Sequence, residues 1–337
     1  MVPVFHPRFV NDPFDDPCLY IDIQREGRAI LFDLGSIERL EAAKVMRVSD
    51  VFISHTHIDH FIGFDHLLRL LLGRDKKLRV FGPPGIIRNV EGKLSAYTWN
   101  LVDDYKFNIE VHEVSVESIS TAYFIASEGF RRRDGEKRLW KDILVEEPLF
   151  TIQAAHLDHK TPSLAFSIKE RFHININKDV LTRLDLPVGP WLNELKRSFR
   201  EEKPMDSKFV ARLEKEGGYE ERLFTLGDFI ENRLVLITRG QKVTYVADAA
   251  GSKENKETIV RLAAGSDTFF CEAAFLDADR DKAFKKYHLT AKDAGGIARE
   301  AGVGRLVVFH FSPKYGENPS DLYEEANREF TMESPPP

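Results

Sequence analysis

The sequence predicts a mixed α/β protein in which two packed sheets lie between outer layers of helices. Hydrophobic residues make up 42% of the 337 positions and charged residues 30%, which is enough apolar material for a sizeable core. The first half is rich in consecutive strand-like segments, and the second half alternates strands with helices. Two sheets with helices outside them accommodate both halves, so we expect a four-layered arrangement.

In the first half, short apolar runs are separated by turn residues. We expect strands at 18–23, 29–33, 50–54, 78–81, 107–116 and 122–126. Helical patterns occupy 37–47, 61–72 and a segment that ends near residue 101. The charged run 131–138 is interpreted as a turn between two strands.

The second half continues with strands at 149–155, 163–168, 234–238, 242–247, 268–271 and 305–309 and helices at 256–264 and 290–301. Between them, residues 172–222 change in character. This segment holds a basic amphipathic helix at 191–200 and a helix-like stretch at 206–216. We interpret 172–222 as an arm inserted into a single domain that spans 1–337.

Charge and cysteine content exclude several classes of protein. The chain has 48 basic and 54 acidic residues, a net charge of −6, so any nucleic-acid binding must come from local basic patches. Two cysteines are too few for a disulfide scaffold, and the N-terminus lacks the layout of a signal peptide. We therefore expect a cytoplasmic protein, and no apolar run is long enough to cross a membrane.

The strongest local signal is Ser-His-Thr-His-Ile-Asp-His at 54–60, directly after an expected strand. His55 and His57, spaced by one residue, are expected to chelate one ion, because neutral imidazole suits zinc. Asp59 and His60 are offset toward a second ion. The alternative is a histidine-rich polar cap without a metal.

A two-metal site needs more ligands, and they should come from other strand ends. His159 is the first candidate, with His156 as its competitor. Asp248 and His310 each follow an apolar strand directly. Taken alone, each is more often an ordinary strand-end polar residue than a ligand, but together with 54–60 they complete a ligand set.

At these motifs the sequence resembles the metallo-β-lactamase superfamily and, within it, the ribonuclease Z family of tRNA 3′-processing endonucleases. The resemblance covers about 30–315. Beyond the histidine motif, it is carried by Phe-Gly-Pro-Pro-Gly at 81–85, Leu-Asp-His-Lys-Thr-Pro-Ser-Leu-Ala-Phe at 157–166, Leu-Pro-Val-Gly-Pro at 186–190, Cys-Glu-Ala-Ala-Phe at 271–275, His-Leu-Thr at 288–290 and His-Phe-Ser-Pro-Lys-Tyr at 310–315.

The resemblance implies a four-layer αββα metallo-β-lactamase sandwich that holds two Zn²⁺ ions, although such ligands also accept Mn²⁺, Fe²⁺ or Co²⁺. It assigns His55, His57 and His159 to one ion, Asp59, His60 and His310 to the other, and Asp248 to both. Asp59 would also orient the attacking hydroxide that the two metals activate, and Glu272 would orient and charge His288 for proton transfer or phosphate neutralisation.

The implied function is that of a zinc phosphodiesterase that cuts precursor tRNA at its 3′ end, as a homodimer, with the arm at 172–222 gripping RNA. For the arm itself, a solvated amphipathic helix is an equally good interpretation.

Three positions depart from the family pattern. The N-terminal segment 6–17 lacks the usual Pro- and Arg-rich loop, Cys271 replaces a histidine, and Leu289 replaces a serine. These departures concern specificity rather than hydrolysis. The alternatives are therefore a hydrolase of small phosphodiesters or other esters without tRNA specificity, and a non-enzymatic scaffold, against which the intact ligand set argues.

Overall fold

The computed structural model describes residues 3–215, 218–316 and 318–332. The chain divides into two compact units, each considered by itself. The larger unit contains the described parts of 3–145, 152–168 and 242–337. The smaller, here called the arm unit, contains 146–151 and 169–241.

The first sheet runs in chain order from edge to edge. Its strands are β1 (Phe5–Phe9), β2 (Leu19–Ile23), β3 (Arg28–Phe32), β4 (Val48–Phe52), β5 (Lys77–Gly82), β6 (Asn108–Val114), β7 (Ser118–Ile125) and β8 (Arg132–Leu139). The pairs from β3 to β6 are parallel, and those at both ends are antiparallel.

The second sheet has the order β18-β17-β16-β11-β10-β9. Its strands are β9 (Ile143–Glu146), β10 (Phe150–Asp158), β11 (Pro162–Glu170), β16 (Lys242–Val246), β17 (Thr268–Glu272) and β18 (Leu306–Phe309). The three last strands pair in parallel. Both sheets are therefore mixed, as the predicted α/β class requires.

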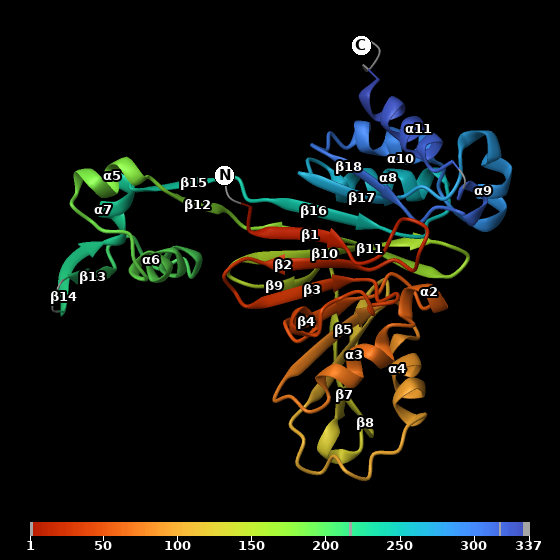
Figure 1. Ribbon diagram of the computed structural model, residues 1–337, viewed down its shortest axis with the longest axis horizontal. Coiled ribbons are helices and arrows are strands. Elements are labelled where there is room, and N and C mark those ends of the chain that lie inside the picture. The colour runs from red at the N-terminus through yellow and green to blue at the C-terminus, as the bar shows by residue number, and fades with distance from the viewer. Residues whose placement is uncertain (1–2, 216–217, 317, 333–337) are drawn as a thin grey trace. The chain divides into compact units, whose positions relative to one another are not determined.

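Helices cover the outer faces of the two sheets in the larger unit (Figure 1). They are α1 (Ala42–Val45), α2 (Ile58–Phe61), α3 (Phe64–Leu71), α4 (Ile86–Ser95), α8 (Lys253–Ala263), α9 (Arg280–Lys286), α10 (Ala291–Glu300) and α11 (Ser320–Thr331). Short 3-10 turns occupy Ala126–Glu128, Asp277–Asp279 and Pro313–Tyr315. α3 and α4 bury apolar residues against the first sheet, and α8, α10 and α11 bury theirs against the second.

Aromatic side chains fill the space between the sheets. Phe32 of the first sheet lies 5.5 Å from Phe166 and 5.7 Å from Tyr245 of the second, measured between ring centroids. Because these rings are fully buried, they hold the carboxyl ends of strands from both sheets together.

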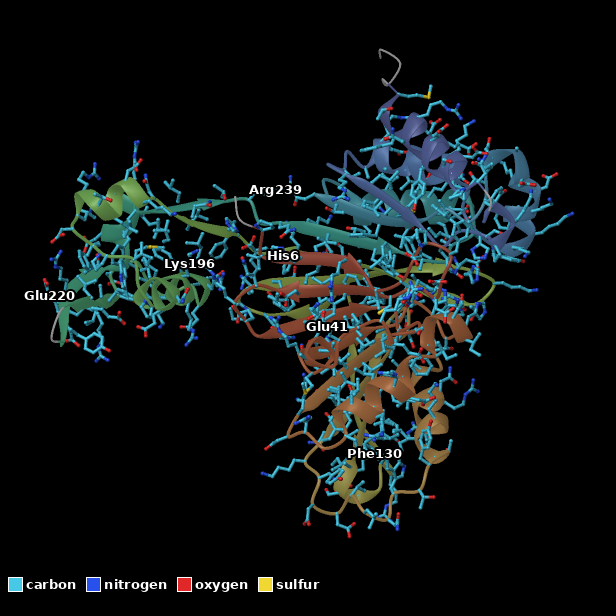
Figure 2. All side chains as sticks on the ribbon, viewed as in Figure 1. His6, Glu41, Phe130, Lys196, Glu220 and Arg239 are labelled. Carbon is cyan, nitrogen blue, oxygen red and sulfur yellow. The ribbon has the colours of Figure 1, made fainter. Side chains whose placement is uncertain are left out.

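The arm unit has its own core. It contains β12 (His173–Ile176), β13 (Lys208–Lys215), β14 (Gly218–Thr225), β15 (Val235–Thr238), α5 (Lys178–Arg183), α6 (Trp191–Arg200) and α7 (Leu226–Glu231). Figure 2 labels Lys196 on α6 and Glu220 on β14. The buried core joins Trp191, Leu195 and Phe199 of α6 to Phe209 of β13 and Phe229 of α7.

Several expected elements differ in the structure. Residues 206–216 were expected to be helical, but Lys208–Lys215 forms a strand, because Phe209, Ala211 and Leu213 alternate with exposed residues and pair with β14. The charged run 131–138 is not a turn but most of β8, whose residues are all exposed.

Two expected helices are shorter than predicted. The pattern at 37–47 gives only α1, four residues long. The pattern at 61–72 is divided at Gly63, where an added Cβ would lie 2.1 Å from the carbonyl oxygen of Gly35. This close approach brings the backbone of 34–35 against the turn that carries the histidine motif.

Candidate metal centre

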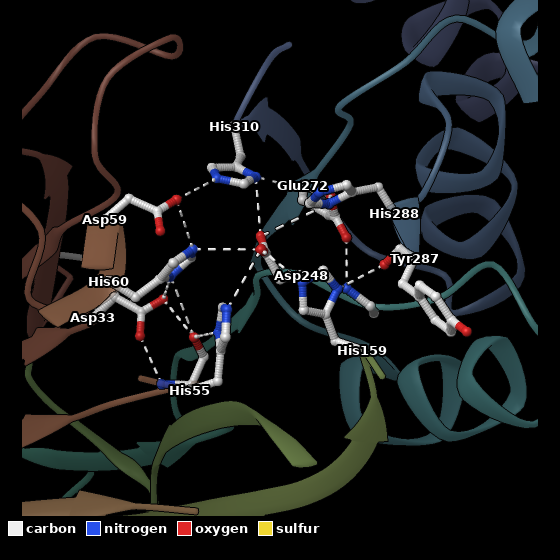
Figure 3. A network of polar contacts seen from close by, with 12 residues as sticks. Asp33, His55, Asp59, His60, His159, Asp248, Glu272, Tyr287, His288 and His310 are labelled. Atoms are coloured by element: carbon white, nitrogen blue, oxygen red, sulfur yellow. Dashed lines mark hydrogen bonds and ion pairs between the residues drawn. The ribbon is translucent and has the colours of Figure 1, made fainter. Parts of the chain in front are cut away.

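The predicted ligands converge where strands of both sheets end (Figure 3). His55 and His60 follow β4, and His159 follows β10. Asp248 and His310 follow β16 and β18, which lie on either side of β17 in a parallel array. Since the carboxyl ends of parallel strands share one edge, this topology brings distant parts of the chain to one point.

The backbone at this point adopts a conformation that non-glycine residues rarely take. Asp33, Asp248 and His310 have φ angles of 56°, 45° and 61°, in the left-handed region. Such residues persist only where their surroundings fix them, and they concentrate at functional sites. Here they turn side chains from the strand ends toward a common centre.

One group of potential ligands consists of His55, His57, His159 and Asp248, whose donor atoms all lie within 4.8 Å of one another. The Nε2 atoms of His55 and His159 are 3.6 and 3.3 Å from Oδ2 of Asp248. His57 is exposed and stacks edge-on against His55, with ring centroids 4.3 Å apart. These are the residues that the sequence placed around one ion, together with the shared aspartate.

A second group consists of Asp59, His60 and His310. The Nε2 atoms of His60 and His310 both lie 3.4 Å from Oδ2 of Asp59. Asp248 also reaches this group, because its Oδ2 is 3.5 Å from Nε2 of His60 and its Oδ1 is 2.9 Å from Nδ1 of His310. Asp248 therefore lies between the two groups.

The second group is adjoined by a glutamate–histidine pair. Glu272 is fully buried at the end of β17, and its Oε2 accepts a hydrogen bond from Nδ1 of His288 at 2.8 Å. Its Oε1 accepts the backbone N–H of Ala249 at 2.6 Å. With Asp248 and His310, these two residues form a third cluster of ligand atoms. His288 also lines the adjoining cavity.

The donor set fits divalent cations. Buried polar atoms are normally hydrogen-bonded. Among the described residues, these buried atoms of the centre make no hydrogen bond of good geometry: Nε2 of His55, Nε2 of His60, Oδ1 of Asp248 and Nδ1 of His310. The last two atoms lie 2.9 Å apart, but only as an ion pair. Imidazole nitrogens and carboxylate oxygens gathered in this way match zinc-type ligation. The two His/Asp groups are consistent with a binuclear metal site.

Protonation of the histidines follows their surroundings. Burial, with the neighbouring imidazole of His60, lowers the pKa of His55 to about 2, so His55 is neutral and can ligate. Burial alone would also lower the pKa of His310, but the carboxylate of Asp248 overrides it and raises that pKa well above its ordinary value. A metal ion would replace this proton, since only neutral imidazole binds metals.

Residues that the sequence did not single out orient the ligands. The buried carboxylate of Asp33 accepts hydrogen bonds from Nδ1 of His60 and from the hydroxyl of Tyr245, both at 2.8 Å. The backbone carbonyl of Tyr287 accepts from Nδ1 of His159 at 2.7 Å. Each bond directs Nε2 of the imidazole inward. Asp33 directly follows β3, but a single carboxylate at a strand end was not distinctive enough in the sequence to single it out.

The competing candidate, His156, lies elsewhere. Its ring packs 5.3 Å from that of Trp140, and it takes part in none of the groups of potential ligands among the described residues. No helix within the described ranges is long and apolar enough to span a membrane.

No protein-family model matches the chain. Among curated proteins, it is 29% identical over 315 residues to the ribonuclease Z of Deinococcus radiodurans, covering 91% of this chain and 90% of that one. It is 28% identical to the ribonuclease Z of Nanoarchaeum equitans, covering 91% and 81% of the two chains. The ribonuclease Z of Haloferax volcanii is 25% identical, with coverage of 93% and 84%.

Two solved structures share the fold. The short form of human tRNase Z matches with a TM-score of 0.52 and 18% identity, covering 91% of this chain and 93% of the other. The metallo-β-lactamase fold protein YhfI from Bacillus subtilis matches with a TM-score of 0.53 and 16% identity, covering 94% and 86%.

The two mixed sheets give the chain the metallo-β-lactamase fold, and the histidine-rich centre lies between the strand ends of this fold. The relatives above match over about nine-tenths of the chain. In sequence, the chain is similar to proteins named ribonuclease Z over nearly its whole length.

Proposed function

We propose that this protein is a zinc-dependent phosphodiesterase that cleaves precursor tRNA after the discriminator base and leaves a 3′-hydroxyl. The observation that carries the proposal is the pair of His/Asp groups that share Asp248. The near full-length likeness to proteins named ribonuclease Z supports RNA as the substrate.

In this proposal His55, His57 and His159 would hold one ion, Asp59, His60 and His310 would hold the other, and Asp248 would serve both. Two bound divalent ions would supply an acidified water and stabilise charge on the phosphoryl oxygens. The Asp59 carboxylate, which is partly exposed beside the cavity, accepts a hydrogen bond from the attacking water and orients it.

In this proposal Glu272 and His288 protonate the leaving group. The hydrogen bond to Glu272 fixes a proton on Nδ1 of His288, and Nε2 is then the atom that donates to the departing ribose oxygen. Burial would lower the pKa of His288, but the charge of Glu272 raises it, which favours the protonated form. His288 lines the cavity, and Glu272 is buried behind it as a positioning residue.

The arm unit supplies the RNA-binding surface in this proposal. A cavity of about 400 Å³ is lined by Arg197, Lys203, Lys208 and Arg212, together with Glu194 and neutral residues. Phosphate contacts from Lys and Arg dominate nucleic-acid affinity. The basic residues of this cavity can therefore attract RNA locally, although the whole chain has a net charge of −6.

The second candidate function is hydrolysis of small phosphodiesters. It is favoured by Asp15 and Asp16, which line the cavity beside Asp59 and add negative charge where a long polyanion would pass. A small diester has no further phosphates to be repelled there.

A direct comparison of substrates separates the two functions. We expect endonucleolytic cleavage of precursor tRNA to a 3′-hydroxyl product, with a rate that falls steeply as salt is raised at subsaturating RNA. Hydrolysis of bis(p-nitrophenyl) phosphate without any tRNA cleavage would establish the second function in place of the first.

The assignment of the centre is tested with Asp59→Ala and a matched histidine control. His57→Ala and Asp59→Ala should abolish turnover on both substrates, and His57→Ala should also lose bound metal. His66→Ala replaces an exposed histidine of α3 and should retain activity and about two ions per chain. Undiminished turnover in Asp59→Ala would refute the two-metal assignment.

We also propose that the protein acts as a homodimer in the cytoplasm. Light scattering of the purified protein should give about twice the mass of one chain, and a mass of one chain under assay conditions would contradict the dimer.

A further inference from the structure

A cavity of about 220 Å³ adjoins the metal centre at Asp59, His288 and His310. This volume is below the ~300–1,000 Å³ of sites for drug-sized ligands, so the cavity suits one small planar group rather than a whole nucleotide. Aromatic rings contribute to its lining: Phe14, Phe275 and Phe311. Aromatic walls beside a phosphodiesterase centre favour a stacked nucleobase, since every base has a π-face.

One wall is the loop 11–17, which is rigidly built. The side-chain amide of Asn11 donates hydrogen bonds to the carbonyls of Asp16 and Ser36, at 2.7 and 2.6 Å. The backbone N–H of Phe311 donates to the carbonyl of Pro13 at 2.8 Å. An added Cβ on Gly35 would lie 2.7 Å from Asp16, so the loop packs directly on the glycine backbone. These contacts fix Phe14 and Asp16 at the cavity.

The carboxylates of this loop differ in their partners. Asp12 and Asp15 form ion pairs with Arg39, at 2.8 and 3.2 Å. Asp16 is half-buried and lines the cavity, and its carboxylate makes no ion pair or side-chain hydrogen bond with any other described residue. Asp16 therefore offers an acceptor to whatever enters the cavity.

The chemistry of that acceptor selects the ligand. Asp16 shares the cavity with a second carboxylate, Asp59, and with Lys286, whose ammonium group lies over the Phe275 ring at 6.0 Å. The two carboxylates repel phosphate but accept hydrogen bonds from an amino group. Cytosine and adenine carry an exocyclic amino group, and Asp and Glu recognise cytosine through it. Uracil carries a carbonyl oxygen at the same place, which would face the carboxylate with no proton between them.

We propose that this cavity binds one amino-bearing base, cytosine or adenine, of the nucleotide whose phosphate lies at the metal centre. Phe14 stacks on the base, and Asp16 accepts a hydrogen bond from its amino group and determines specificity. The inference rests on the phosphodiesterase activity in the proposed function but not on tRNA as the substrate.

The test uses mononucleotides as competitors of bis(p-nitrophenyl) phosphate hydrolysis by the metal-loaded protein. CMP should inhibit at about one-tenth the concentration needed for UMP, the discrimination expected of one hydrogen bond to a charged acceptor. The N4,N4-dimethyl derivative of CMP, which has no amino proton, should inhibit no better than UMP. This comparison needs no variant and therefore does not depend on one that folds.

Single substitutions then test whether Asp16 and Phe14 cause the preference for CMP. Asp16→Asn should reduce the ratio of CMP to UMP inhibition to near one, because an amide both accepts and donates. Phe14→Ala should weaken both nucleotides about tenfold and keep their ratio, since stacking tolerates any base. Asp12→Asn, on the same loop but paired with Arg39, should keep the wild-type ratio.

Equal inhibition by CMP, its dimethyl derivative and UMP in the wild-type protein would overturn this inference and leave the tRNA proposal untouched. Conversely, a CMP preference together with no cleavage of precursor tRNA would support the base pocket and refute tRNA as the substrate.

Discussion

Asp33 has the most connections of any residue that supports the centre. Fully buried and in a left-handed backbone conformation, its carboxylate accepts hydrogen bonds from Ser54, His60 and Tyr245. It fixes which nitrogen of His60 faces inward, and it ties the first sheet to the second through Tyr245. The orientation of a metal-ligating imidazole depends on the residue that hydrogen-bonds to its other nitrogen, here Asp33.

We predict that Asp33→Asn lowers metal affinity and activity by about 10–100-fold, the usual cost of losing such a partner. Tyr245→Phe removes one donor to Asp33 and leaves His60 in place, so it should cost clearly less. Metal content by mass spectrometry and kcat on bis(p-nitrophenyl) phosphate provide the measurements. Equal effects of the two variants would show that Asp33 is not acting through His60.

At the scale of the element, α10 begins immediately beside His288. Thr290 and Asp293 form a capping box at its N-terminus, and Arg280 and Lys256 both bond to the Asp293 carboxylate. Burial alone would raise the pKa of Asp293, but these cations lower it below its ordinary 3.8. The ionised carboxylate therefore stabilises the folded state above about pH 3.8, and this stabilisation disappears as the pH falls through the lower pKa of the folded protein.

Asp293→Asn should accordingly lower the free energy of unfolding at pH 7, by about 1–2 kcal/mol for a cap with charged partners. The difference between variant and wild type should shrink below pH 3.8. Urea unfolding at pH 7 and at pH 3 measures both values. A difference that is the same at the two pH values would mean that the charge of Asp293 contributes nothing.

In the arm unit, the hairpin of β13 and β14 contributes Lys208 and Arg212 to the basic cavity. If these cations contact RNA phosphates, Lys208→Ala should weaken tRNA binding irrespective of sequence and reduce the salt slope by about one. Lys178→Ala, which removes an exposed lysine of α5 outside the cavity, is the matched control. Filter binding between 50 and 200 mM salt gives the slopes. An unchanged slope for Lys208→Ala would exclude this surface as the RNA site.

The same hairpin shows where the sequence was insufficient. Charged and apolar residues alternate around 206–216, where the sequence predicts a helix. Phe209, Ala211 and Leu213, however, lie on one face only if the segment is a strand. The strand forms because β14 lies opposite, which is a tertiary effect that a local window does not contain. α6 had the predicted bounds of 191–200, because its apolar stripe is helical whatever its partner.

The candidate site was more predictable than the hairpin. The spacing within 54–60 and the strand-end positions of His159, Asp248 and His310 are local features, and the parallel strands bring them together. The contacts of Asp33 and Tyr287 depend on the packing of two sheets and on a left-handed backbone turn. Such contacts leave no spacing pattern, so the residues behind the ligands could be found only in the structure.

For the whole molecule, the candidate metal centre brings together residues that follow strands of two different sheets. The segment His55–His60 follows a strand of the first sheet, and Asp248 and His310 follow strands of the second. Their buried nitrogens and oxygens without hydrogen bonds of good geometry favour the bound state, so metal ions should stabilise the larger unit by linkage. The arm unit has a separate core and contributes no residue to the groups of ligands found in the described chain.

Removal of metal ions by a chelator should therefore destabilise the larger unit and leave the stability of the arm unit unchanged. We expect amide hydrogen exchange to rise after EDTA treatment at the ends of β4, β16 and β18, where backbone turns are fixed by the ligands, and to stay unchanged in α6 and β13. The larger unit should also unfold at a lower temperature, and added Zn²⁺ should restore both properties. If exchange rises equally in the arm unit, the ions stabilise the chain through something other than these ligands. If exchange rises nowhere, the strand ends hold their positions without metal, and the histidine cluster is preformed by the packing of the two sheets.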